Sequence, residues 1–294
     1  MAGVSARCVC LKTTPFLSFP PSRTCPTFAA DKFFFMPQFI LDVKLPMSWR
    51  NLTDSQLRFA FTRIASDRSA TAIATQCLLR WNRLHVLHAD GPVAVLRKGH
   101  HRILLSAQQI AEAIQTLSWL STLPERPVRV AQTGGAEALA ADFAGVPFEQ
   151  FLVCDNLYQG YLQTHSSELL AEMATVLYPG IRLRRAHPRG TADAEPADPW
   201  LLTCVFYWFA SLKQHLAREY PHFFRAAPGN ALGPVMPTRR QLQEAMNTQI
   251  RALTKGDITK EREVLAMDTH RALTELDAQA REYETLHSKS NKQP

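Results

Sequence analysis

The sequence between Thr238 and Leu286 has the pattern of two consecutive amphipathic helices, and it constrains the fold more than any other stretch. Thr238 and Gln241 are spaced as a capping box, in which each side chain accepts a hydrogen bond from the backbone N–H of the other residue. The first helix is predicted to end at Gly256, because glycine enters a left-handed C-terminal turn without a steric cost. Its apolar residues recur every three or four positions and so share one face: Leu242, Met246, Ile250 and Leu253.

The second helix is predicted over residues 259–286, close to the C-terminus. Its apolar stripe is surrounded by charged residues, as in a helix that covers the body of its own protein or meets a helix of a partner. Intramolecular docking and partner binding are both consistent with this pattern. We take the stripe as the candidate partner-binding surface, and its residues are Leu265, Ala272, Leu276, Ala280, Tyr283 and Leu286.

Further helices and one small sheet are predicted upstream. Capping boxes begin at Thr53 and Ser106, each with a glutamine three residues later. Short apolar runs between residues 84 and 105 are separated by Asp90-Gly91 and by Gly99, which predicts an antiparallel meander. A short strand is expected at residues 128–131, and longer helices over 148–163, 168–178 and 200–219. The fold class is therefore α+β, predominantly helical with one small antiparallel sheet.

Composition along the chain suggests its domain organisation. Residues 1–35 are basic and rich in Ser, Thr and Pro, and are predicted to be disordered or to precede the true start of translation. Residues 181–199 contain almost no apolar periodicity and are predicted to be a mobile linker. This linker would separate a mixed α+β region, residues 36–180, from a helical region, residues 200–287. The remaining residues, 288–294, are predicted to be a disordered tail.

The overall charge is moderately basic, with 33 Lys and Arg residues against 26 Asp and Glu residues and a net charge of +7. A basic excess favours contact with nucleic acid or with acidic protein surfaces. Because part of the excess lies in the two termini, a nucleic-acid-binding accessory protein is the alternative interpretation rather than the first one.

Apolar segments and cysteines indicate a folded protein in a reducing compartment. The longest apolar run, residues 200–212, is shorter than the roughly 20 residues that cross a bilayer, so a buried core helix is expected and no membrane contact. The six cysteines lack the spacing of zinc ligands. Cys77, Cys154 and Cys204 are isolated in apolar surroundings and are predicted to act as small buried hydrophobic residues.

Three patterns could carry chemistry, and each has a simpler structural interpretation. His100-His101 lacks the further ligands that a zinc ion needs. Gly134-Gly135 lacks the spacing and the lysine of a phosphate-binding loop. Three carboxylates are spaced so that no tight pair shares a helix face: Asp142, Glu149 and Asp155. The sequence therefore predicts no catalytic, metal-binding or cofactor-binding residue and favours a non-enzymatic protein, with an enzyme site assembled from distant residues as a further alternative.

Aromatic residues cluster at Phe206-Tyr207-Trp208-Phe209. Such a group could stack on nucleic-acid bases or line a ligand pocket. The surrounding helix is apolar on nearly every side, however, which is typical of a central core helix. We therefore expect these rings to pack in the protein interior.

Four sequence phrases resemble, as a set, uncharacterised proteins encoded in prophage-like gene clusters of gut bacteria. They are SWRNLTDSQLR (48–58), YQGYL (158–162), FYWFASL (206–212) and the stretch 246–283 that contains ALTKGDIT. The resemblance covers about Met36 to Leu286. It implies a structural or assembly factor of a virion, such as a tail-assembly or head–tail component, that contacts other phage-type proteins or further copies of itself. It also implies a location in the cytoplasm of a bacterial host or within the virion, and it assigns no site residues.

Overall fold

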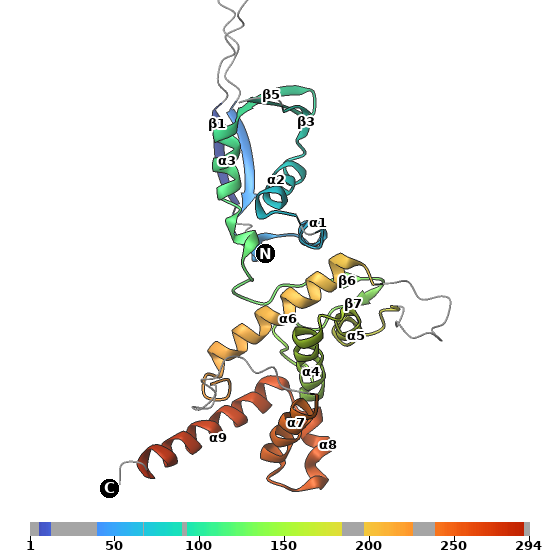
Figure 1. The fold of residues 1–294 in the computed structure, drawn as a ribbon, viewed down its shortest axis with the longest axis vertical. Helices are drawn as coiled ribbons and strands as arrows, with labels where there is room; N and C mark the ends of the chain where they lie inside the picture. Colours follow the sequence, from blue (N-terminus) through green and yellow to red (C-terminus); the bar gives the residue numbers. More distant parts are fainter. Residues whose placement is uncertain are drawn as a thin grey trace, which may run out of the picture. The chain divides into compact units, whose positions relative to one another are not determined.

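The structure is a computed structural model that describes residues 6–12, 40–66, 68–89, 93–183, 197–225 and 239–290 (Figure 1). These residues form a predominantly helical α+β fold with one small three-stranded antiparallel sheet. The fold class predicted from the sequence is thereby confirmed.

The chain divides into two compact units. Unit 1 comprises Met1–Leu52 and Arg68–Thr122, and unit 2 comprises Thr53–Asp67 and Leu123–Pro294. This division differs from the one expected from composition, because the segment 181–199 lies within unit 2. The helices before and after that segment pack against each other, so no boundary falls between them. Residues 184–196 of the segment lie outside the described residues.

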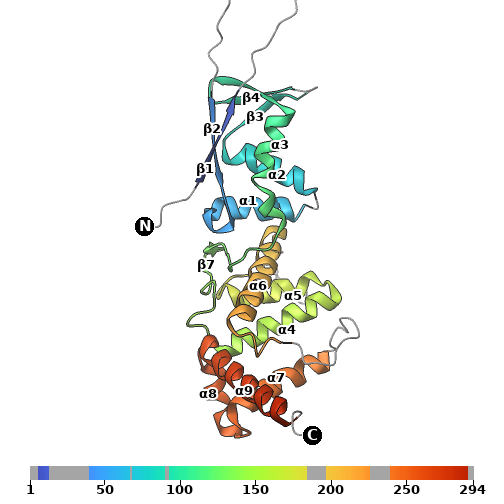
Figure 2. The same cartoon turned by 90° about the vertical axis from the view of Figure 1, so that its left-hand side faces the viewer.

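Unit 1 contains two antiparallel sheets and two helices. In the larger sheet the strand order is β3-β4-β5, and in the smaller one β1 pairs with β2 (Figure 2). Strand β1 lies within the segment 1–35 for which the sequence predicted disorder; residues 1–5 and 13–39 are outside the described part of the chain. The elements are β1 (Ala6–Lys12), β2 (Ile40–Pro46), η1 (Trp49–Asn51), α2 (Ala70–Trp81), β3 (His85–His88), β4 (Val93–Lys98), β5 (His101–Ser106), α3 (Ala107–Gln115) and η2 (Ser118–Ser121).

In unit 1, local sequence signals explain where helix α3 begins and where the turn between β4 and β5 forms. The predicted capping box of α3 is present, with the Gln109 N–H donating to Ser106 Oγ at 3.2 Å and the Ser106 N–H donating to Gln109 Oε1 at 2.9 Å. Gly99, between β4 and β5, has a φ of +61°, a conformation that glycine adopts without steric cost. The predicted meander is confirmed, although its other turn, at Asp90-Gly91, falls on residues that the structure does not describe.

Unit 2 is built around helices α4 and α6, which pack together: α1 and α5 lie against α6, and α7, α8 and α9 lie against α4. It also contains a two-residue hairpin, β6–β7, whose turn is formed by Gly134 and Gly135 with φ values of +54° and +77°. The segment expected to be a strand at 128–131 is not one; Ala131 instead leads directly into β6. The elements are α1 (Asp54–Ile64), β6 (Gln132–Thr133), β7 (Ala136–Glu137), α4 (Phe148–Thr164), α5 (Ser167–Leu177), α6 (Pro199–Glu219), α7 (Arg239–Thr254), η3 (Ile258–Lys260), α8 (Glu261–Ala266) and α9 (Thr269–Ser290).

Helix α6 forms the centre of the core of unit 2. Trp208 and Phe209 are fully buried, and the Trp208 indole N–H donates to the Ala141 carbonyl at 2.7 Å. Phe143 meets both rings edge to face, at centroid distances of 6.4 and 6.2 Å. Phe206 is half-buried and packs on Tyr158 at 5.8 Å. The expected core role is therefore confirmed for Trp208 and Phe209, whereas Phe206 and Tyr207 are only half-buried. Among the described helices, α6 included, none combines the length and the apolar character that a bilayer span requires.

Helix α1 belongs to unit 2 although its sequence interrupts unit 1. Its capping box is present, with the Thr53 N–H donating to Gln56 Oε1 at 2.9 Å. The Arg58 guanidinium lies over the Trp200 ring of α6 at 4.6 Å. Phe61, which is fully buried, meets Tyr207 edge to face. These contacts fix α1 on α6.

The C-terminal end of α7 forms a Schellman motif. The Gly256 N–H donates to the Arg251 carbonyl, and the Lys255 N–H donates to the Ala252 carbonyl. Lys255 occupies the left-handed C′ position, with a φ of +54°, and Gly256 follows with a φ of +82°. The predicted helix end is confirmed, but a lysine takes the position expected for glycine. The capping residue expected at the start of this helix, Thr238, lies outside the described residues.

Candidate protein-interaction surface

The helix predicted over residues 259–286 is interrupted, which divides the candidate stripe between α8 and α9. Asp268 causes the interruption: its Oδ1 accepts from the Arg271 N–H at 3.1 Å, as an N-cap residue does. Its Oδ2 accepts from the Gly145 N–H at 2.7 Å. The expectation of one continuous helix is wrong, because Asp268 begins a new helix and at the same time binds a loop more than 120 residues away.

A short antiparallel contact fixes the start of α9 beside the start of α4. The Phe148 N–H donates to the Met267 carbonyl at 2.8 Å, and the Thr269 N–H donates to the Val146 carbonyl at 2.9 Å. The Thr269 hydroxyl, which is fully buried, donates to the same Val146 carbonyl at 2.7 Å. Each buried polar group here has a partner, so this junction is a fixed point of unit 2.

The structure brings only some of the six predicted residues to the surface. Ala272 and Leu276 are 0% and 5% exposed, so they pack inside unit 2 and cannot meet a partner. Leu265, on α8, and Ala280 are half-buried. Tyr283 and Leu286 are 65% and 68% exposed. The first part of the stripe therefore docks on the protein itself, and the last part faces solvent.

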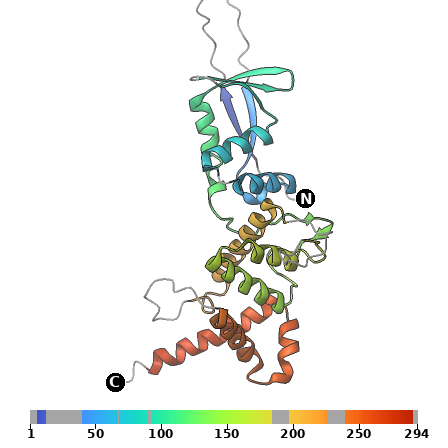
Figure 3. The same cartoon turned by 45° about the vertical axis from the view of Figure 1, so that its right-hand side comes forward.

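The exposed part of the stripe continues the buried part along the same helix. Tyr283 follows Leu276 by seven residues, which is about two turns, so both side chains lie on nearly the same face of α9. Leu286 follows Tyr283 by three residues and is its neighbour on the helix surface. In Figures 1 and 3 the C-terminal turns of α9 lie apart from α7 and α8. We call Tyr283 and Leu286 the α9 apolar pair.

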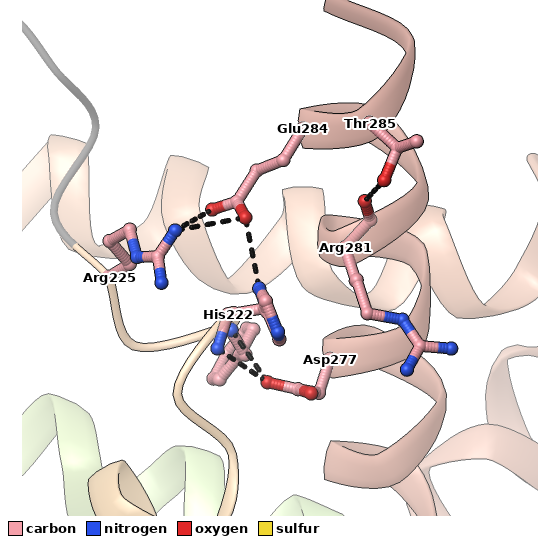
Figure 4. A network of polar contacts seen from close by, with 7 residues as sticks. His222, Arg225, Asp277, Arg281, Glu284 and Thr285 are labelled. Carbon is pink, nitrogen blue, oxygen red and sulfur yellow. Dashed lines mark hydrogen bonds and ion pairs between the residues drawn. The ribbon is translucent and has the colours of Figure 1, made fainter. Parts of the chain in front are cut away.

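Polar contacts hold the middle of α9 against the turn that follows α6 (Figure 4). Asp277 Oδ1 accepts from the backbone N–H groups of His222 and Phe223 at 2.8 and 2.9 Å. Glu284 Oε2 accepts from His222 Nδ1 at 2.9 Å and from Arg225 Nη1 at 3.0 Å. The Arg225–Glu284 pair is largely exposed and contributes less than about 1 kcal/mol to stability. The two backbone N–H groups that donate to Asp277 form the stronger contact.

The first turn of α9 is fixed by a second polar chain. The Asp142 carbonyl lies 2.8 Å from His270 Nε2, so that nitrogen carries the proton and donates. His270 Nδ1 is hydrogen-bonded to the Tyr220 hydroxyl, also at 2.8 Å, which is much closer than the Glu219 carboxylate at 3.8 Å. Burial raises the pKa of Tyr220 and keeps it a hydroxyl that can donate. Together with the contacts of Asp277, this chain makes α9 a rigid support for its exposed end.

Residues considered for chemistry have structural partners in unit 2. Asp155 forms an ion pair with Lys213 at 2.7 Å and so joins α4 to α6. Asp142 accepts from the Ala144 N–H in its own turn, and Glu149 is exposed in the first turn of α4. The structure does not show these three carboxylates gathered around one point.

The remaining candidates from the sequence are accounted for in the described parts of both units. His100 is exposed in the β4–β5 turn, and His101 begins β5. Within the described ranges, no three His, Cys, Asp or Glu side chains are placed to hold a metal ion together. Cys77, Cys154 and Cys204 are buried and carry free thiols, as expected for small hydrophobic core residues.

Comparison with known proteins adds no further constraint. No protein-family model, no curated protein and no solved structure matches the chain.

Sequence reasoning found the stripe but missed the residues that position it. Asp268-Thr269 has the pattern of an N-cap and could have indicated a second helix start. No local signal could identify Asp277 or His222, because their contacts join residues more than 50 positions apart.

Proposed function

We propose that this chain is a non-enzymatic assembly protein of a phage or prophage that acts through protein–protein contacts. The observation that carries the proposal is the α9 apolar pair, in which the face that is buried at Leu276 becomes exposed at Tyr283. A rigid helix that presents an aromatic and an aliphatic side chain at helical spacing suits docking against an apolar groove or another helix. The prophage context is supported by the sequence phrases at 48–58, 158–162, 206–212 and 246–283.

The contacts that hold α9 against the rest of unit 2 strengthen this proposal. The buried Thr269 junction and the Asp277 carboxylate fix the helix at two places along its length. A partner that docks on the exposed end then loses little conformational entropy of this helix. Tyrosine is also among the residues that contribute most to binding energy in protein interfaces.

Two surface substitutions test the proposal in cells that produce the particles. The double variant Tyr283→Ser/Leu286→Ser removes the apolar pair but leaves the buried residues of α9 in place. We expect the protein to accumulate normally and the yield of assembled particles to fall at least about tenfold, the loss that corresponds to about 1.4 kcal/mol of binding energy. Particles are counted by electron microscopy of purified lysates.

The matched control is Arg271→Ser/Glu282→Ser, which changes two exposed residues of α9 without changing the net charge. It should leave the yield unchanged. A normal yield from the Tyr283→Ser/Leu286→Ser variant would contradict the proposal. Deletion of residues 259–294 is unsuitable for this purpose, because it also removes Val264, Leu273 and Leu276 from the core.

A further inference from the structure

The net positive charge of the chain is concentrated in unit 1. Unit 1 holds 12 Lys and Arg residues and 4 Asp and Glu residues, a net charge of +8; unit 2 holds 21 and 22, a net charge of −1. The segment Arg68–Thr122 contains two acidic residues in all, Asp90 and Glu112. The modest excess of the whole chain therefore conceals one strongly basic unit and one nearly neutral unit.

Within unit 1, strand pairing places three basic side chains in a line across the larger sheet. His85 lies opposite Arg97, and Arg97 lies opposite Arg102, so all three share one face. All three are exposed, whereas Leu96 and Ile103, the neighbouring pair, are buried on the other face. We call His85, Arg97 and Arg102 the basic row. Among the described residues, neither Arg97 nor Arg102 forms an ion pair with a carboxylate.

Lys98 and two histidines lie beside the basic row. His85 is the first residue of β3, Arg97 lies near the end of β4, and Arg102 lies near the start of β5, so the row crosses one end of the sheet. At that end β4 closes with Lys98, the turn contains His100, and β5 begins with His101. Like charges placed directly opposite one another destabilise a sheet. A polyanion bound across this end would remove that repulsion.

We propose that the basic row of unit 1 binds the phosphate backbone of duplex DNA. Two arginines side by side suit phosphate oxygens, because each guanidinium can donate two parallel hydrogen bonds. Strands β3, β4 and β5 contain no Phe, Tyr or Trp, so the face lacks the aromatic rings on which proteins stack the bases of single strands. Contacts to the backbone alone predict binding that is independent of sequence and weakens steeply with salt.

The basic row lies in unit 1 and the α9 apolar pair in unit 2, and binding of DNA by the first does not depend on the second. Purified full-length protein is titrated into a fluorescein-labelled duplex of about 20 base pairs over a series of salt concentrations, and binding is followed by anisotropy. The Arg97→Gln/Arg102→Gln variant should bind at least about tenfold more weakly at low salt. Its slope of log affinity against log salt should be smaller by about 2 than that of the wild-type protein.

The control variant Arg251→Gln/Arg271→Gln removes the same charge from exposed positions of unit 2 and should bind like the wild-type protein. Circular dichroism melting shows whether each variant is folded. Equal losses in the two double variants would overturn the assignment to the basic row, and so would an absence of duplex binding by the wild-type protein at low salt.

Two competitors show which kind of anion the basic row prefers. Single-stranded DNA of the same length and poly-glutamate should each displace the labelled duplex less effectively than unlabelled duplex does. Equal competition by single-stranded DNA, or stronger competition by poly-glutamate, would overturn the proposal of a duplex partner, and the latter result would assign the surface to an acidic protein.

Discussion

At the scale of single residues, burial keeps cysteine and tyrosine side chains of unit 2 in their neutral forms. Burial is the main reason why the pKa of Cys204 rises from its ordinary value of 9.0 to about 11; hydrogen bonds with Tyr178 and the Val130 backbone act in the opposite direction. Burial also raises the pKa of Tyr178, whose hydroxyl donates to the Val130 carbonyl at 3.0 Å. The thiolate is the reactive form of cysteine, so Cys204 should be inert in the folded protein.

Cys204 gives the first prediction, a loss of stability at high pH. Because its folded pKa is raised, the neutral thiol contributes stability that is fully present below pH 9.0 and is lost as the pH rises to about 11. A Cys204→Ala variant should therefore lose less stability than the wild-type protein over this interval. Urea unfolding at a series of pH values measures the difference. Identical pH profiles of stability for the two proteins would show that this pH dependence does not come from Cys204.

Asp277 gives a second prediction at this scale. Asp277→Ala leaves the N–H groups of His222 and Phe223 without their acceptor and should lower the free energy of unfolding by about 1–3 kcal/mol. Asp277→Asn keeps an oxygen acceptor and loses the charge, so it should lower the free energy of unfolding by less than Asp277→Ala does. Chemical denaturation compares the two variants, and equal losses would show that the carboxylate oxygen does not hold the turn.

At the scale of helices and strands, sequence reasoning succeeded where the signal is local. The capping boxes at Thr53 and Ser106 depend on residues three positions apart, and both are present. The division between α8 and α9 was not predicted from the sequence, because Asp268 is one of many charged residues in this stretch and nothing distinguishes it from the others. Its role depends on the distant Gly145 N–H, which no periodicity reveals.

The junction between α8 and α9 gives the third prediction. Asp268→Ala removes the N-cap acceptor of α9 and the acceptor of the Gly145 N–H, which should cost about 0.5–2 kcal/mol of stability. The amides at the start of α9 should then exchange faster with deuterium than those near Leu276. Uniform exchange along α9 in this variant would argue against a local role for the cap.

The basic row gives the fourth prediction, which concerns stability rather than binding. Arg97 has a like charge, Arg102, directly opposite it on β5, so Arg97→Gln should leave the sheet more stable by about 0.2–1 kcal/mol. Thermal unfolding at low salt measures the gain, which should shrink as salt screens the repulsion. A loss of stability would show that the arginine contributes to the fold and would weaken its assignment to a ligand.

At the scale of the whole molecule, composition could not predict how the chain divides. Unit 2 includes residues 53–67, which lie inside the sequence of unit 1, because Phe61 and Arg58 pack on α6. The low-periodicity segment 181–199 suggested a boundary, yet α5 and α6 on either side of it form one core. Contacts between residues that are distant in sequence decide this division, and composition does not report them.

The division also separates two kinds of surface. Net charge over the whole chain hides the basic character of unit 1, because unit 2 carries nearly equal numbers of acidic and basic residues. Unit 2 instead presents an apolar pair at the end of a firmly held helix. We propose that unit 2 contacts other proteins and that unit 1 binds DNA, and this combination suits a role in assembly.

The most direct test of the assembly role is site-specific cross-linking from the α9 apolar pair. A photoreactive phenylalanine analogue at Leu286 is activated in cells that produce particles, and cross-linked proteins are identified by mass spectrometry. We expect cross-links to another particle protein or to a second copy of this chain, and none from the analogue at the exposed Glu275. Cross-links confined to residues of the same molecule, or equal cross-linking from the two positions, would contradict it.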